Sequence, residues 1–92
     1  MSIQWLFDVI EDRKKNPTEK SYTTSLFKDG VPKIAQKVGE EGTEVVIAAL
    51  AQSDERLIEE IADLTYHTLV LLSARGINPD QVVAELQKRH RK

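Results

Sequence analysis

The sequence contains no cysteine, which excludes disulfide bonds and thiolate metal sites. It also lacks an excess of positive charge, since 13 Lys and Arg residues face 15 Asp and Glu residues and the formal net charge is −2. Nucleic-acid-binding domains carry a basic surface, so we expect no nucleic-acid partner. No apolar run approaches the about 20 residues of a membrane span. The N-terminal residues lack the features of a secretory signal. We therefore expect a cytoplasmic protein with no membrane partner.

The chain is short. Its 92 residues predict one domain, residues 1–92, with 40% hydrophobic and 30% charged residues. A chain of this size buries only roughly 60–65% of the surface that it exposes when unfolded. Apolar residues recur at helical spacing, and no segment alternates with a period of two. The sequence therefore predicts an all-α protein, and its limited core predicts a homodimer or a dimer-based oligomer.

Four helices are predicted, over about residues 2–15, 31–52, 54–75 and 79–90. Gly76 is expected to end the third helix. The other expected capping residues are Ser2, Ser53 or Asp54, Asn78 and Gln81. Residues 16–30 are rich in Asn, Pro, Thr, Ser and Gly, and we expect them to form a loop.

Acidic residues interrupt the apolar face of the second predicted helix. At about 100° per residue, Glu41 lies in the middle of a stripe formed by Ile34, Val38, Val45 and Ala48. Three further charged residues follow the edge of this stripe: Lys37, Glu40 and Glu44. The second helix is thus predicted to carry a charged strip along its core face.

The third predicted helix repeats this pattern. Glu60, Asp63 and His67 are stacked beside an apolar stripe of Leu57, Ile61, Leu64, Thr68 and Leu71. If the two helices pack antiparallel, the pairs Glu41–Glu44 and Glu60–Asp63 converge. Unpaired, these carboxylates would repel one another. A divalent cation would remove the repulsion, and oxygen ligands favour magnesium or manganese.

Simpler interpretations exist for these residues. Glu-x-x-Glu pairs are common on solvated helices, and Lys37 and Glu41 have the spacing of an ordinary surface ion pair. A single histidine such as His67 is more often a hydrogen-bonded core residue than a ligand. Gly39 and Gly42 each cost about 1 kcal/mol relative to alanine. We expect them to let a neighbouring helix or a ligand approach the backbone.

The segments KVGEEGTEVVIAAL and EEIADLTYHTLVLL resemble the phosphoribosyl-ATP pyrophosphohydrolases of histidine biosynthesis. These enzymes belong to the all-α nucleoside triphosphate pyrophosphatases, together with MazG-like enzymes and dimeric dUTPases. The superfamily pattern of Glu-Glu-x-x-Glu and Glu-x-x-Asp is matched by residues 40–44 and 60–63, with 15 residues between. The upstream SYTTSLFKDG resembles the phosphoribosyl-ATP branch, and the resemblance covers about residues 5–86.

The resemblance implies a MazG-like fold of four helices, completed by dimerisation, and a Mg²⁺-dependent hydrolase. It would convert phosphoribosyl-ATP to phosphoribosyl-AMP and pyrophosphate, the second step of L-histidine biosynthesis, with Mn²⁺ as an alternative cation. Glu40 would be a fifth carboxylate contact or a base that orients water. Lys37, with Lys28 and Lys33 as weaker candidates, would offset phosphate charge. The implied metal ligands are Glu41, Glu44, Glu60 and Asp63. Coupling to the phosphoribosyl-AMP cyclohydrolase, to which this domain is fused in some organisms, would be in trans.

Two other functions fit parts of the sequence. A house-cleaning nucleotide pyrophosphatase of the MazG-like type would share the metal site and act on non-standard or deoxynucleoside triphosphates. A helical dimerisation module without activity would need no metal. Turnover of phosphoribosyl-ATP and of deoxynucleoside triphosphates separates the first alternative, and the effect of Mg²⁺ on thermal stability separates the second.

Overall fold

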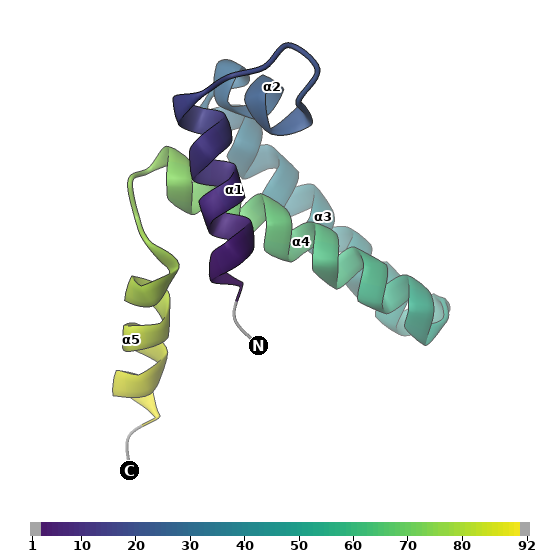
Figure 1. The fold of residues 1–92 in the computed structure, drawn as a ribbon. Helices are drawn as coiled ribbons and strands as arrows, with labels where there is room; N and C mark the ends of the chain where they lie inside the picture. Colours follow the sequence, from purple (N-terminus) through teal and green to yellow (C-terminus); the bar gives the residue numbers. More distant parts are fainter. Residues whose placement is uncertain (1–2, 91–92) are drawn as a thin grey trace.

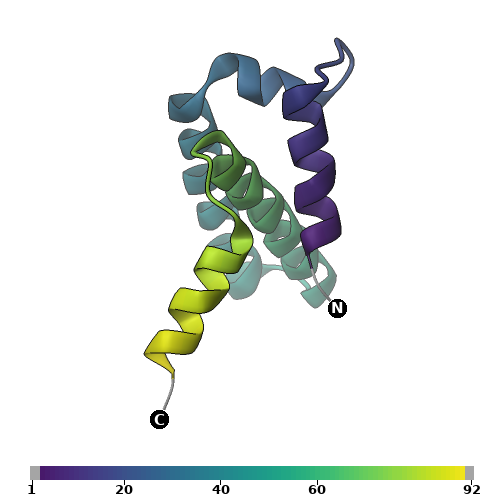
Figure 2. The ribbon, with the colours of Figure 1, turned by 60° about the vertical axis from the view of Figure 1, so that its left-hand side comes forward.

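The computed structural model describes residues 3–90, which form five helices: α1 (Gln4–Lys15), α2 (Tyr22–Asp29), α3 (Val31–Ala51), α4 (Asp54–Ala74) and α5 (Pro79–Arg89) (Figure 1). No strand occurs among these residues, so the all-α class is confirmed. A short turn joins α3 to α4, and the two helices lie antiparallel. α1 and α2 pack against one end of this hairpin, and α5 extends away from it (Figure 2). None of the described helices is long and apolar enough to cross a membrane.

The predicted loop over residues 16–30 is wrong in its second half, because α2 occupies most of it. The side chain of Ser21 caps α2 by accepting a hydrogen bond of 3.1 Å from the backbone N–H of Thr24. Leu26 is buried in the core shared with α1, α3 and α4. Serine and threonine lower the local helix propensity, but the cap and the burial of Leu26 outweigh that effect. Gly30, with φ of +90°, separates α2 from α3 in a conformation that favours glycine.

The other predicted helix ends are close to those observed. Ser53 caps α4, and Asn78 and Gln81 form a capping box at the start of α5. Gly76 follows α4 with φ of +70°, as expected for a residue that ends a helix. The predicted cap at Ser2 lies outside the described residues.

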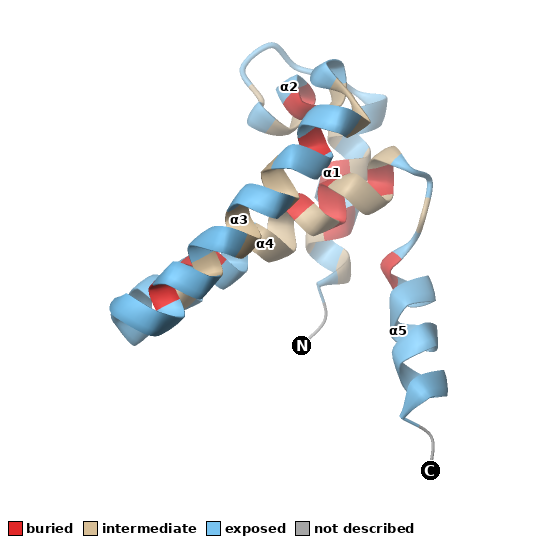
Figure 3. Ribbon diagram, turned by 180° about the vertical axis from the view of Figure 1, so that it is seen from behind, coloured by how far each residue is buried: buried red, intermediate tan, exposed pale blue. Residues whose placement is uncertain are grey.

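The core lies where α1, α2, the start of α3 and the end of α4 meet. It consists of Phe7, Ile10, Leu26, Ile34, Leu69 and Val70. Polar contacts fasten α1 to the end of α4: Lys14 Nζ donates a hydrogen bond of 2.8 Å to the Ser73 carbonyl, and the Ser73 hydroxyl donates to Glu11. The Ser73 hydrogen bond is the main cause that lowers the pKa of Glu11. This end of the molecule is therefore the well-packed one (Figure 3).

Among residues 3–90, no other helix covers the far end of the α3–α4 hairpin (Figures 1 and 3). It exposes five large apolar side chains: Val46, Ile47, Leu50, Ile58 and Ile61. Leu50 is 82% exposed. α5 is exposed apart from Pro79, and it adds Val82, Val83 and Leu86 to the apolar surface (Figure 3). Exposed apolar side chains gathered in this number at the end of one hairpin favour an interaction site there.

The two glycines in α3 do not serve helix packing within the chain. A Cβ atom added at Gly39 or at Gly42 would meet no atom within 4 Å. The expectation that they admit a neighbouring helix is therefore wrong for the helices of this chain. The approach of a ligand to this backbone stays a prediction.

Candidate functional site

The core face of α4 is rotated from its predicted position. Ile61, assigned to the apolar stripe, is 46% exposed, whereas Glu60 and His67 are buried. α4 packs against α3 on one side and against α1 on another, so no single apolar stripe marks its buried surface. The stripe predicted for α3 is confirmed, since Ile34 and Ala48 are buried and Glu41 is partly buried between them.

Three carboxylates converge between α3 and α4. Glu41 on α3 and Glu60 and Asp63 on α4 each place an oxygen within 4.8 Å of the others. Glu60 is only 6% exposed, and Asp63 is open to solvent. The i, i+3 spacing of Glu60 and Asp63 puts both on the side of α4 that faces Glu41. We call Glu41, Glu60 and Asp63 the acidic cluster.

The charge of the acidic cluster is only partly balanced. Desolvation is the main cause that raises the pKa of Glu60 above its ordinary value of 4.5, and a hydrogen bond with Asp63 adds to it. Arg56 acts in the opposite direction, and the negative charges of Glu41 and Glu44 raise the pKa further. A divalent cation bound by these oxygens would offset the desolvation and the charge repulsion that disfavour the ionised form of Glu60.

Glu44 and Glu40 lie outside the acidic cluster. Glu44 is exposed, because it is rotated about 60° around α3 from Glu41. It is still close enough to influence Glu60 electrostatically. Glu40 points along the outer surface of α3 and accepts hydrogen bonds from Gln36 at 2.8 Å and Lys37 at 3.2 Å. These two bonds, with Gln36 first, lower the pKa of Glu40.

Lys37 lies between the acidic cluster and the surface. Its ammonium is 3.2 Å from Glu40 and 4.0 Å from Glu41, and its side chain is 26% exposed. The hydrogen bond to Glu40 is the main cause that raises the pKa of Lys37. The predicted ion pair with Glu41 is thus present but is longer than the one with Glu40. A cation one turn from Glu41 is well placed to meet an anion bound at the cluster.

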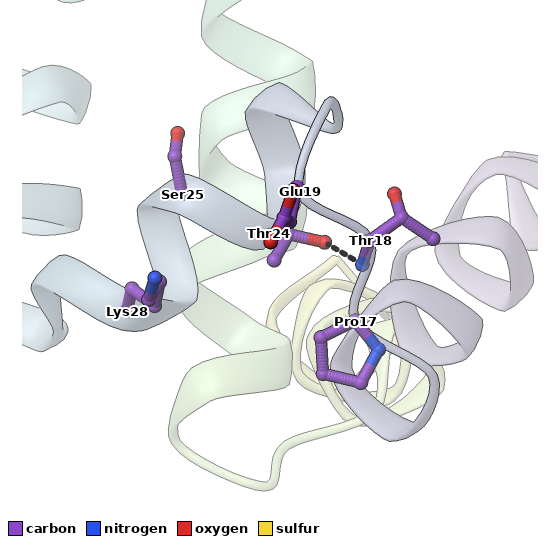
Figure 4. Close-up of a pocket in the computed structure, with 6 residues that line it drawn as sticks. All are labelled: Pro17, Thr18, Glu19, Thr24, Ser25 and Lys28. Atoms are coloured by element: carbon purple, nitrogen blue, oxygen red, sulfur yellow. Dashed lines mark hydrogen bonds between the residues drawn. The ribbon is translucent and has the colours of Figure 1, made fainter.

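The two weaker lysine candidates lie elsewhere. Lys33 is exposed on the first turns of α3, where its charge reaches Glu40. Lys28 lines a separate pocket of about 460 Å³ between α2 and the preceding loop (Figure 4). Pro17, Thr18 and Glu19 of the loop form its other wall, and the Thr18 N–H donates to the Thr24 hydroxyl across it. Within residues 3–90, neither lysine forms an ion pair with a carboxylate of the acidic cluster.

Arg56 is a site residue that sequence reasoning missed. One guanidinium nitrogen lies 3.1 Å from Glu60, and another contacts Glu59. Arg56 precedes Glu60 by four residues, the spacing of countless surface ion pairs, so its position in the sequence gives no special signal. Only the burial of Glu60 shows that this pair neutralises part of the acidic cluster.

His67 is a hydrogen-bonded core residue, as the simpler interpretation proposed. Its Nδ1 lies 2.8 Å from the Asp63 carbonyl oxygen, and its Nε2 lies 3.0 Å from the Tyr22 hydroxyl. Both ring nitrogens are therefore engaged away from the carboxylates of the acidic cluster.

The chain matches the sequence profile of the phosphoribosyl-ATP pyrophosphohydrolase family over residues 4–90. The chain belongs to this family. Similar proteins named phosphoribosyl-ATP pyrophosphatase include one from Clostridium acetobutylicum, 55% identical over 87 residues that cover 95% of this chain and 79% of the relative. Another, from Lacticaseibacillus casei, is 52% identical over 99% of this chain and 83% of the relative. A third, from Sulfurisphaera tokodaii, is 49% identical over 91% and 89%.

In this member of the phosphoribosyl-ATP pyrophosphohydrolase family, we expect Glu60→Gln to stabilise the metal-free protein at pH 7. The raised pKa means that ionised Glu60 disfavours the folded state above that pKa. The gain should shrink as the pH falls through the raised pKa and vanish below 4.5, where Glu60 is protonated in both states. Thermal unfolding with a chelator at pH 7 and pH 4 measures this.

Glu59→Gln is the matched control, since Glu59 also binds Arg56 but is exposed. It should change the melting temperature little at either pH. A Glu60→Gln protein that melts below the parent at pH 7 would contradict the prediction.

Proposed function

We propose that this chain hydrolyses phosphoribosyl-ATP to phosphoribosyl-AMP and pyrophosphate at the acidic cluster, with Mg²⁺ or Mn²⁺ as its cation. This is the second step of L-histidine biosynthesis, and we assign it to the cytoplasm. The observation that carries the proposal is the convergence of Glu41, Glu60 and Asp63 within 4.8 Å in a chain of this family. The relatives named phosphoribosyl-ATP pyrophosphatase support the choice of substrate.

The residues of the acidic cluster fit a hard divalent cation. All three offer carboxylate oxygens, which suit magnesium and manganese. Glu60 is buried with a raised pKa, so its ionised form lacks a full counter-charge. Glu44 lies on the exposed flank of the cluster and completes the proposed ligand set. When bound, the cation supplies charge neutralisation for the triphosphate and activation of a water for attack on the α-phosphorus.

The remaining residues hold and balance charge. Lys37 stabilises the negative charge that develops on the departing pyrophosphate. Glu40 orients Lys37 through their 3.2 Å hydrogen bond, and it would orient the attacking water as a base or add a fifth carboxylate contact. Arg56 neutralises Glu60 until a cation binds. Positioning and electrostatic stabilisation are the main sources of catalysis in such transfers.

The proposed protein is a homodimer, or an oligomer built from dimers. The far ends of α3 and α4 are too apolar for a surface in contact with water. Packing of these ends against the same ends of a second copy would bury this surface. It would also place two acidic clusters in one assembly. Coupling to a phosphoribosyl-AMP cyclohydrolase in trans remains part of the proposal.

Release of pyrophosphate from phosphoribosyl-ATP, with and without Mg²⁺, tests the function. We expect activity only with the cation, and much faster turnover than with deoxynucleoside triphosphates. Glu41→Gln and Asp63→Asn should each abolish most of the activity while the helical circular dichroism spectrum is kept, because each removes a cluster oxygen. Glu55→Gln, an exposed change at the start of α4, is the control. Near-parent turnover of both cluster variants at saturating Mg²⁺ would exclude these residues from the mechanism.

Lys37→Met should lower kcat/KM at least tenfold, which corresponds to about 1.4 kcal/mol of transition-state stabilisation. As a surface ion pair alone, Lys37 would contribute only roughly 0.2–0.5 kcal/mol to stability and nothing to the kinetics. Steady-state kinetics at saturating Mg²⁺ measure the effect. Lys15→Met, at an exposed site on α1, controls for loss of a charge. Unchanged kinetics in a folded Lys37→Met protein would show that Lys37 is only a surface residue.

Light scattering at micromolar concentration should give at least twice the 10.4 kDa mass of one chain. Leu50→Glu should shift the protein toward the monomer, because a charge at this apolar site would be buried in the interface. Val9→Glu, an equally drastic change at an exposed position of α1, should leave the mass unchanged. A folded parent of about 10 kDa would rule out the proposed assembly.

A further inference from the structure

Tyr22 and Tyr66 pack against His67, and the reaction described above does not use them. Tyr22 is the first residue of α2 and is 52% exposed. Tyr66 on α4 stacks on it, with ring centroids 6.2 Å apart and ring planes at 28°. His67 contacts both tyrosines edge-on, with centroid distances of 5.9 Å and 5.0 Å. The three rings form one aromatic group between α2 and α4.

The hydrogen bonds of His67 indicate which way the Tyr22 hydroxyl donates. A carbonyl oxygen can only accept, so the contact of 2.8 Å between His67 Nδ1 and the Asp63 carbonyl places the proton on Nδ1. In a neutral imidazole with that proton, Nε2 is the acceptor, and the Tyr22 hydroxyl donates to it over 3.0 Å. His67 itself is buried.

The Tyr22 ring is therefore held in place although half of it is exposed. Its hydroxyl is bound to His67, and its ring stacks against that of Tyr66 at a centroid distance of 6.2 Å. Tyr66 is fixed in turn by a hydrogen bond between its hydroxyl and Thr23. An aromatic surface that is already rigid loses little conformational entropy when a ligand binds.

Hydrogen bonds tie the Tyr22 ring to the acidic cluster. Tyr22 bonds His67, and His67 bonds the backbone carbonyl of Asp63, a member of that cluster. α2, which begins at Tyr22, also packs against α3, the helix that carries Lys37 and Glu41. The exposed ring therefore lies two hydrogen bonds from the turn of α4 that presents Asp63.

We propose that Tyr22 binds the purine ring of the nucleotide substrate by stacking, with Tyr66 and His67 as the positioning residues that hold it. This inference rests on the proposed function, since it assigns the base of the same substrate whose phosphates meet the acidic cluster. Aromatic side chains and purines attract through their flat faces, and each such contact contributes substantially to nucleotide affinity. Tyr22 is then a specificity residue that recognises the base, while the acidic cluster and its cation bind the phosphates.

The test compares Tyr22→Leu with Tyr22→Phe. The affinity for phosphoribosyl-AMP is measured by calorimetry, and KM and kcat are measured with phosphoribosyl-ATP. Tyr22→Leu should weaken product binding and raise KM about tenfold, with a much smaller effect on kcat. Tyr22→Phe keeps the ring and should recover most of that loss. Inorganic tripolyphosphate has no base, so its inhibition constant should be the same in Tyr22→Leu as in the parent.

Two controls separate stacking from a structural role. Trp5→Leu removes an aromatic side chain that is 61% exposed on α1, and it should change none of these quantities. Tyr22→Gln removes the ring but keeps an N–H that can donate to His67. It should therefore show the same loss of affinity for phosphoribosyl-AMP as Tyr22→Leu, and it serves as the test if Tyr22→Leu folds poorly. Melting temperature and mass are recorded for every variant.

Several results would overturn the inference. They are an unchanged affinity for phosphoribosyl-AMP in Tyr22→Leu and Tyr22→Gln, an equal loss of tripolyphosphate inhibition, or a Tyr22→Phe protein as impaired as Tyr22→Leu. The last result would show that only the hydroxyl matters. A parent protein that releases no pyrophosphate from phosphoribosyl-ATP would instead contradict the proposed function. The two failures are therefore distinguishable.

Discussion

The antiparallel packing of α3 and α4 brings a buried carboxylate, Glu60, against two others, and the rest of the site depends on balancing that charge. Within the described residues, the balance comes from Arg56 at 3.1 Å and, for the neighbouring Glu41, from Lys37 at 4.0 Å. Neither ion pair is deeply buried on both sides, so the pKa of Glu60 stays raised. A site that tolerates this cost in its folded state is suited to gain stability from a cation.

The fold concentrates its rigidity at one end of the hairpin. α1 and α2 cover the start of α3 and the end of α4, where the apolar core and the contacts of Ser73 lie. The acidic cluster sits near the middle of the hairpin, between this packed end and the exposed apolar end around Leu50. The packed end of the hairpin therefore positions the carboxylates of the acidic cluster. The exposed end presents the apolar surface that we propose to be covered by a second copy.

α2 links the packed end to the chemistry. Its N-terminal residue, Tyr22, is bonded to His67, which is bonded to the backbone of Asp63. Through these contacts the position of Asp63, a proposed metal ligand, depends on a helix that composition alone assigned to a loop. The capping hydrogen bond of Ser21 and the burial of Leu26 are what make α2 possible.

The sequence by itself determined the helical class, most helix ends and the acidic residues. Periodicity reports which residues can share a face, and caps such as Ser53 and Gly76 act locally, so neither needs the fold. It also placed Glu41 within the apolar stripe of α3. Only the tertiary structure decided that Glu60 is buried while Ile61 is exposed, and that Glu44 lies outside the acidic cluster. It also decided that Arg56 pairs with the buried Glu60 and that Tyr22 bonds His67. These outcomes depend on how α1, α2 and α3 surround α4, and that arrangement is set by contacts between residues far apart in the chain.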